Sequence, residues 1–500
     1  MISPIGVRSH RITRKIIMKT VLLPALLLIS LALPWPQQKP PENILAISDV
    51  TVIDATGAPA KPNMTVIITG DQITRIAKTG EVAIPKNAQV IDGKGKFLIP
   101  GLWDMHVHTV WKGLPEKYFP MFIANGVTGV RDMASNVGLL KQLRKDINEG
   151  RLMGPRLIGG PMVDGPIPIW PVPAISISNE ADARKTVASI KDSGADFIKV
   201  YSLIPRQAYF ALADEAKKRG IPFAGHVPIS VSAAEASDAG QRSIEHMEGI
   251  LVACSAAEPE LRKTIEESIK DAKDTDQIRE SLVRALDETY SRTLETYSEE
   301  KATALFARFA RNGTWQAPTL VVHRVGAFLD DKDFTNDPRL KYVRRDLRDS
   351  WKNQDDFRLK NRTAESSELG KRLLQKRLEI ILAMHRAGVK MLAATDALVM
   401  YVFPGFSLHD ELELFVQAGL TPMEALQTAT SNPAIYLGLS DLVGTVEIGK
   451  KADLVLLEAN PLENISNTKR INAVVVNGKL IPRVTLDKML KDAEAAATRQ

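Results

Sequence analysis

The chain has 500 residues, of which 44% are hydrophobic and 25% are charged, enough for a large core and more than one domain. The formal net charge is +6, but the first 33 residues hold five basic side chains and no acidic one, so six minus five leaves +1 for the remainder. A nearly neutral body excludes the basic surface that binds nucleic acid, and the composition excludes a disordered or fibrous protein.

The N-terminal region has the order of an export signal. Its basic residues precede an apolar run at residues 21–33, which is too short to span a bilayer because a helix needs about 20 residues. We therefore expect residues 1–33 to be a signal peptide with small residues for cleavage at Ser30-Leu31-Ala32, and the protein to be periplasmic or secreted. An uncleaved anchor is the alternative. The proline-rich residues 34–43 predict a linker.

Short β-like runs separated by glycine turns occur at both ends of the remaining chain. Residues 44–97 contain four such runs, and residues 436–484 contain three more, with turns such as Asn477-Gly478. We expect the two segments to pair into one small β-sandwich domain, so that the middle of the chain is an insertion between its halves.

Residues 98–435 alternate eight apolar β-like runs with amphipathic helical segments. This α/β pattern is typical of a parallel sheet, and eight units predict a (β/α)8 TIM barrel. Two charged helical stretches, near residues 255–300 and 328–375, exceed the usual length of a connection. We expect them to be solvated helices at the barrel rim, and a lid over the site is the alternative. The predicted strands are residues 101–108, 129–131, 156–158, 197–201, 223–226, 243–246, 316–322 and 391–395.

The strongest local signal is Gly101-Leu-Trp-Asp-Met-His106-Val-His108. Residues two apart on a strand share a face, so both histidines can bind one metal at the end of the first barrel strand. Other candidates end other predicted strands, which is where barrel enzymes place their active sites. Each alone has a structural alternative, such as a helix cap for an acid or a lysine that reaches water. These candidates are Lys199, His226, His246 and Asp396.

Cys254 is the only cysteine, so the chain can form neither an internal disulfide nor a metal site built from several cysteines. A metal must therefore be held mainly by histidine, carboxylate or a modified lysine. A lysine such as Lys199 inside a barrel is costly unless something compensates its charge.

Four separated motifs occur in one order along the chain. They are Phe97-Leu-Ile-Pro-Gly-Leu102, Gly126-Val-Thr-Gly-Val-Arg-Asp132, Thr428-Ala-Thr-Ser-Asn-Pro-Ala434 and Gly444-Thr-Val-Glu-Ile-Gly-Lys-Lys-Ala-Asp-Leu-Val455. Together with the candidate ligands, they resemble the amidohydrolase superfamily, especially its binuclear branch of imidazolonepropionase-like and Xaa-Pro dipeptidase-like enzymes.

The resemblance implies two divalent metal ions, with Zn²⁺ as the default. His106, His108 and Asp396 would hold the first ion, and His226 and His246 the second. Lys199 would be N-carboxylated, so that its carbamate bridges both ions. The implied reaction is hydrolysis of a C–N bond by a metal-bridging hydroxide, with Asp396 as the catalytic residue that moves the proton to the leaving nitrogen.

The sequence identifies the substrate less specifically than it identifies the metal ligands. Tyr201 and His409 are the candidate substrate contacts, and the alternatives are a packed tyrosine and an ordinary helix histidine. A dipeptide or an N-acyl amino acid is the expected substrate, and a cyclic amide is the main alternative. Two other functions fit the sequence less well. A mononuclear deaminase would not need Lys199 as a bridging ligand, and a non-catalytic relative would be expected to lose some of the metal ligands. The sequence leaves open whether the chain forms a homo-oligomer.

Overall fold

The structure is a computed structural model that describes residues 43–498, except 170–172, 353–358 and 361. The predicted signal peptide and nearly all of the predicted linker lie outside the described residues. Among the described helices, none is both long enough and apolar enough to cross a membrane.

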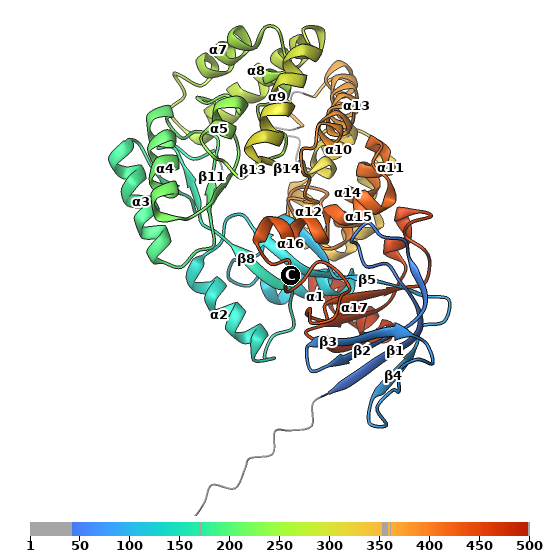
Figure 1. Cartoon of the computed structure of the whole chain (residues 1–500). Coiled ribbons are helices and arrows are strands. Elements are labelled where there is room, and N and C mark those ends of the chain that lie inside the picture. Colours follow the sequence, from blue (N-terminus) through green and yellow to red (C-terminus); the bar gives the residue numbers. More distant parts are fainter. Residues whose placement is uncertain (1–42, 170–172, 353–358, 361, 499–500) are drawn as a thin grey trace, which may run out of the picture. The chain divides into compact units, whose positions relative to one another are not determined.

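An eight-stranded sheet takes its strands from both ends of the described chain (Figure 1). The two groups of strands meet where β5 pairs antiparallel with β15. The sheet order is β17-β16-β15-β5-β1-β2-β3, with β4 beside β1. The strands are β1 (Ile44–Val52), β2 (Lys61–Thr69), β3 (Gln72–Lys78), β4 (Gln89–Asp92), β5 (Phe97–Pro100), β15 (Leu454–Leu457), β16 (Ile471–Val476) and β17 (Lys479–Pro482).

Alternating apolar residues bury one face of this sheet, among them Leu45 and Ile47 of β1 and Leu454 and Leu456 of β15. All eight strands belong to a single hydrogen-bonded sheet, where the sequence predicted a β-sandwich. The pattern could not distinguish the two, because alternation fixes which side chains are buried and not how many sheets bury them.

The middle of the chain supplies parallel strands. β6 (Leu102–Val107), β7 (Val127–Asp132) and β8 (Arg156–Gly159) form one sheet. A second sheet contains β9 (Met162–Asp164), β10 (Ile175–Ser176), β11 (Ile198–Val200), β12 (Phe223–Gly225), β13 (Ser243–Glu245) and β14 (Trp315–Ala317).

Residues 391–397 join these two parallel sheets. Met391 forms a parallel bridge with Gln316 of β14, and Ala397 forms another with Val107 of β6. The result is a mixed α/β fold in which the carboxyl ends of neighbouring parallel segments lie together.

Helices connect the parallel segments (Figure 1). They include α1 (Pro115–Ala124), α2 (Val137–Asn148), α3 (Glu180–Asp192), α4 (Arg206–Arg219), α5 (Ala233–Asp238), α9 (Glu299–Asn312) and α14 (Phe406–Ala418). Asn136 and Asn179 cap α2 and α3 by accepting hydrogen bonds from their first turns. Three more helices, α15 (Pro422–Thr428), α16 (Ser431–Leu437) and α17 (Arg483–Thr498), complete the C-terminal part, and α17 packs against α1.

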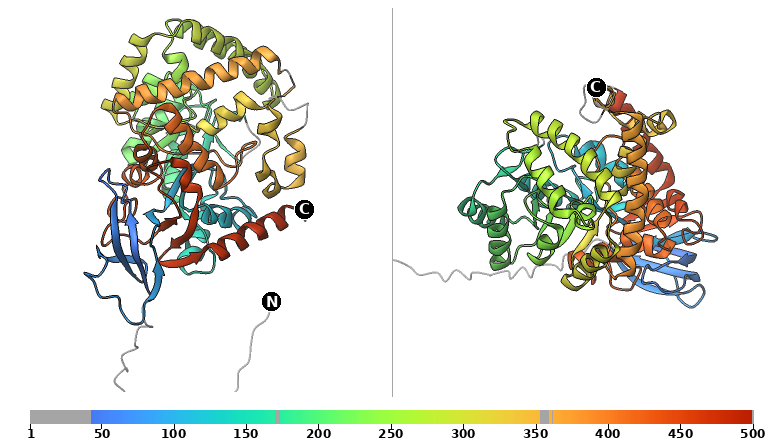
Figure 2. Two further views of the ribbon diagram at one scale, coloured as in Figure 1. Left: turned by 90° about the vertical axis from the view of Figure 1, so that its right-hand side faces the viewer. Right: turned by 90° about the horizontal axis from the view of Figure 1, so that it is seen from above.

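The two long charged stretches are helical where the structure describes them. The first holds α7 (Glu258–Ser268) and α8 (Thr275–Glu295), which follow α6 (Ile250–Ala253). The second follows α10 (Leu320–Phe328) and holds α11 (Lys332–Thr335), α12 (Arg345–Ser350) and the start of α13 (Ala364–Arg386). Helix α13 packs against α8, α10 and α14 (Figure 2).

Candidate metal centre

The six predicted ligands occupy the carboxyl ends of the parallel segments. His106 lies in β6 and His108 follows it, Lys199 lies in β11, His226 follows β12, His246 follows β13, and Asp396 ends the segment that bridges to β6. The backbone N–H of Asp396 donates to the carbonyl of His106 at 2.7 Å, which holds these two ligand positions side by side.

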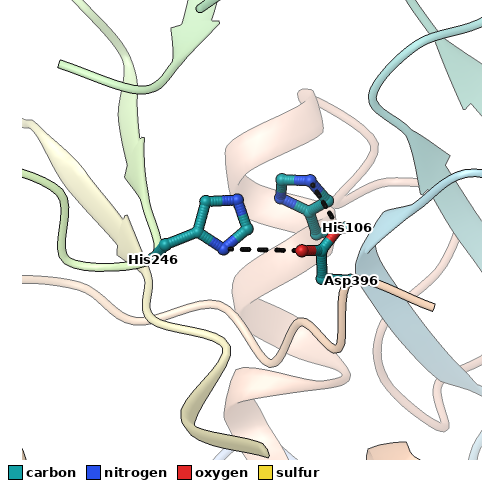
Figure 3. A group of neighbouring side chains, drawn as sticks. All are labelled: His106, His246 and Asp396. Atoms are coloured by element: carbon teal, nitrogen blue, oxygen red, sulfur yellow. Dashed lines mark ion pairs between the residues drawn. The ribbon is translucent and has the colours of Figure 1, made fainter. Parts of the chain in front are cut away.

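His106, His246 and Asp396 can each offer one ligand atom, and these atoms lie within 4.8 Å of one another (Figure 3). The two carboxylate oxygens of Asp396 lie 3.4 Å from Nε2 of His106 and 3.9 Å from Nδ1 of His246. His108 joins them, because its Nε2 is 3.0 Å from Asp396 Oδ1 and 3.3 Å from His106 Nε2. The group takes members from both predicted metal sites.

His226 and Lys199 border this group. The ring centroids of His226 and His246 are 4.8 Å apart. Lys199 is 0% exposed, and its Nζ has no hydrogen-bond partner among the residues that the structure describes. Burial lowers the pKa of Lys199 to about 8, although the carboxylates of Glu245 and Asp396 act in the opposite direction.

Burial favours the neutral form of His106, His226 and His246. Burial, followed by the charge of Lys199, lowers the pKa of His106 and of His226 well below the ordinary value, and burial lowers that of His246 to about 3. One nitrogen of each ring already has a partner, which fixes the ring and leaves the other nitrogen for a ligand. These partners are Glu245 for His106 at 2.8 Å, Ser202 for His226 at 2.7 Å and Thr319 for His246 at 2.8 Å.

Comparison with known proteins identifies the family. The model of the amidohydrolase family matches residues 97–481, which is most of the chain. The chain belongs to the amidohydrolase family. This confirms the assignment that the sequence motifs predicted.

Individual relatives match this amidohydrolase over shorter regions. Ochratoxinase from Aspergillus niger is 36% identical over 100 residues, 19% of this chain and 20% of that enzyme. Imidazolonepropionase from Sphingopyxis alaskensis is 40% identical over 85 residues, 16% of this chain and 20% of that enzyme. The matched region thus spans about a fifth of these curated relatives.

A solved structure of a Xaa-Pro dipeptidase with bound methionine in the active site shares the fold. It superposes with a TM-score of 0.61 at 20% identity, covering 88% of this chain and 100% of that one.

The donor set of the amidohydrolase fits divalent metal ions. Neutral imidazoles and an ionised carboxylate are ligands that Zn²⁺ and similar ions accept. Burial would raise the pKa of Asp396, but its neighbours, among them the hydrogen-bonded His108 and the cation of Lys199, hold that pKa below its ordinary value, so the carboxylate is charged. Lys199 is the one member that does not fit as an unmodified cation.

A glycine makes room for Lys199. Gly225 has a φ of +144°, and a Cβ at this position would lie 2.1 Å from the carbonyl oxygen of Val200 and 2.9 Å from Cδ of Lys199. Only glycine allows β12 to approach β11 this closely. The Gly-His pair in Phe223-Ala-Gly-His226 is the sequence signal for this contact.

Sequence reasoning missed the residues that orient His106. Both oxygens of Glu245 accept hydrogen bonds from Arg131, at 2.9 and 3.0 Å, while Glu245 Oε2 contacts His106 Nδ1. Arg131 also donates to Ser243 and to Tyr436, at 3.0 Å each. Arg131 and Glu245 are at most 1% exposed, so this is a fully buried and well-satisfied ion pair.

Thr319, which holds His246, is positioned by the start of α10. Its φ of 47° lies in the left-handed region, and the next two backbone N–H groups donate to the carboxylate of Glu411 at 2.9 and 2.8 Å. The predicted strand 316–322 is therefore too long: β14 ends at Ala317, and α10 begins at Leu320.

The two predicted substrate contacts differ in outcome. Tyr201 lies against the cluster, with its ring centroid 4.0 Å from that of His226, and its contact with substrate stays a prediction. His409 is 1% exposed, and its ring nitrogens bond Thr468 Oγ1 at 2.9 Å and the carbonyl of Asn125 at 3.0 Å. Neither nitrogen is left for a substrate, so the role predicted for His409 is replaced by a structural one.

Proposed function

We propose that this amidohydrolase hydrolyses an amide or peptide C–N bond at a binuclear metal centre. The observation that carries the proposal is the Nζ of Lys199, which is fully buried beside three neutral imidazoles and has no hydrogen-bond partner in the described part of the chain. An uncompensated cation is costly there, and it would repel metal ions. N-carboxylation would convert it into an anionic ligand, which removes both difficulties.

The ligands then divide into two sets. His106, His108 and Asp396 would hold one ion, His226 and His246 would hold the other, and the carbamate of Lys199 would bridge them. Zn²⁺ is the ion that we propose, because imidazole and carboxylate oxygen suit it. When bound, such a pair of ions lowers the pKa of a shared water and polarises a carbonyl oxygen.

Asp396 is the proposed proton shuttle. Its carboxylate is ionised, lies 3.0 Å from His108 and is 13% exposed, so it can accept the proton of the attacking water. The same group would then return the proton to the leaving nitrogen. The hydrogen bond from its backbone N–H to His106 keeps it beside the ligands throughout.

A dipeptide or an N-acyl amino acid is the substrate class that we propose. The likeness to a Xaa-Pro dipeptidase structure and the matched region of ochratoxinase support amide hydrolysis. A cyclic amide is the second candidate, favoured by the matched region of imidazolonepropionase. The proposal includes a closed (β/α)8 barrel, supported by the bridges from residues 391–397 to β14 and β6.

The test combines metal content with a hydrolysis screen. We expect two metal ions per chain by plasma mass spectrometry, and turnover of a dipeptide, an N-acyl amino acid or a lactam. A single ion after full loading would overturn the binuclear centre. Lys199→Ala should lose activity and recover part of it with added short carboxylic acids. His385→Ala is the matched control, because His385 pairs with Glu424 at 3.0 Å away from the ligands and should change neither readout.

Export is a separate proposal. It is supported by the basic residues and the apolar run within residues 1–33. The N-terminal sequence of the protein recovered from a secreting host tests it: loss of the segment of residues 1–33 is expected, and an intact N-terminus on protein retained inside the cell would contradict it.

A further inference from the structure

A cavity of about 370 Å³ lies beside the metal centre, between α8, α10 and α13. His323 and Val399 line it, and both hydrogen-bond the backbone of predicted ligands: His323 Nε2–H donates to the carbonyl of His246 at 2.9 Å, and Val399 N–H donates to that of Asp396 at 3.0 Å. Two residues that line the cavity therefore contact two of the predicted ligand residues directly. Its volume falls within the range of small-molecule sites.

The lining is mostly apolar, with side chains from three helices and from the segment after Asp396. Aliphatic groups of this kind favour an apolar ligand body. They include Val283, Val322, Val325, Leu369, Leu373 and Met400.

One buried cation, Arg377 of α13, stands out in this apolar wall. It is 9% exposed and forms no ion pair within 4.0 Å with a described residue; the carboxyl of Glu248 acts on it only from a greater distance. Its polar neighbour is Tyr290 of α8, whose ring centroid is 5.4 Å from the guanidinium carbon. Arg131, which is 1% exposed, has the carboxylate of Glu245 at 2.9 Å. Arg377 thus carries a buried charge without the ion pair that normally accompanies one.

A second guanidinium in the same cavity is also incompletely satisfied. Arg362 bonds Asp330 through Nε at 2.6 Å, but its Nη2 is buried without a hydrogen-bond partner in the described part of the chain. Asp287 also lines the cavity, yet it forms no ion pair with either arginine. The cavity therefore combines apolar walls with two guanidinium groups, and that of Arg362 has a free donor.

We propose that this cavity binds the free carboxylate and the adjoining apolar side chain of the substrate, with Arg377 as the carboxylate anchor. A guanidinium presents paired N–H donors that match a carboxylate, and a desolvated pair of this type is strong. The inference rests on the proposed function, and it narrows the substrate to an N-acyl amino acid or peptide whose C-terminal residue is apolar. Arg377 is thereby a specificity-determining residue rather than a catalytic one.

Calorimetric titration of the full metal-loaded protein with hexanoate and with hexanol tests the anchor. The two probes share an apolar chain, and neither has an amide bond to hydrolyse. We expect Arg377→Met to weaken hexanoate binding about tenfold or more while leaving hexanol unchanged, because only the acid uses the guanidinium. Arg377→Lys, which keeps the charge but loses the paired donors, should weaken hexanoate binding by a smaller factor.

Arg372→Met is the matched control, because Arg372 is exposed on the same helix, and it should bind both probes as the wild type does. Hexanoate binding that is unchanged in both folded Arg377 variants would overturn the inference. If Arg377→Met does not fold, the lysine variant alone decides. Turnover is not needed for this readout: a protein that hydrolyses no amide but binds hexanoate through Arg377 contradicts the proposed function alone.

Discussion

Replacing Glu245 with glutamine tests how the proposed ligand His106 is held. The carboxylate of Glu245 contacts Nδ1 of His106 at 2.8 Å and accepts two hydrogen bonds from Arg131, and both members of the ion pair are at most 1% exposed. Glu245→Gln changes the volume little but removes the charge. The guanidinium is then buried without a counter-ion, and the single amide oxygen cannot serve both neighbours.

Two effects of known size should follow. The free energy of unfolding should fall by about 3–5 kcal/mol, which is typical when one partner of a buried ion pair is lost. Metal affinity should fall by about 10–100-fold, because the orientation of His106 is no longer fixed. Urea unfolding of chelator-treated protein measures the first effect without metal, and competition with a coloured chelator measures the second.

A double variant separates charge from orientation. Arg131→Met combined with Glu245→Gln removes both charges, so it should regain part of the lost stability but none of the lost metal affinity. Glu266→Gln is the control, since this residue forms an exposed pair with Arg262 and should cost less than about 1 kcal/mol. A loss of similar size, below about 1 kcal/mol, for Glu245→Gln would refute the reasoning.

Three further predictions concern single residues. Asp396→Asn should keep its metal, measured by mass spectrometry, but lower kcat by about 10²–10⁴-fold because the proton shuttle is lost. Gly225→Ala should lower the melting temperature and the folded yield, since its Cβ would lie 2.1 Å from the Val200 carbonyl oxygen. Burial raises the pKa of Glu411 from 4.5 to about 8, against its backbone donors. Between these values the unfolded chain loses a proton that the folded chain keeps, so the free energy of unfolding should fall as pH rises, and Glu411→Gln should flatten that dependence in urea titrations.

The positions of the candidate ligands could be predicted from sequence because each ends a parallel segment. Alternation along the strand aligned His106 with His108, and the order of the motifs supplied the family, which the match over residues 97–481 confirms. The cost of a buried lysine marks Lys199 as a residue that needs a compensating partner. These inferences needed only local pattern and the rule that parallel strands end together.

The partners of the ligands could not be predicted in this way. Glu245 is 139 residues from His106, and Thr319 is 73 residues from His246, so only the folded chain brings them together. A regular strand would also point Glu245 and His246 to opposite faces. The φ of 58° at His246 ends the strand there, and both side chains then contact or approach His106.

Three of the nine non-glycine residues with a positive φ in the described part of the chain lie at the candidate centre. His246, Thr319 and Asp396 all have a positive φ, at 58°, 47° and 63°, although none is glycine. Such conformations cost about 1–3 kcal/mol each and persist only where the surroundings fix them. Here the backbone N–H of His246 donates to Ala317 at 2.9 Å, and that of Asp396 donates to His106 at 2.7 Å. Because these bonds direct the side chains before any ion is bound, a metal would have little conformational freedom left to remove, and this preorganisation favours binding at the site.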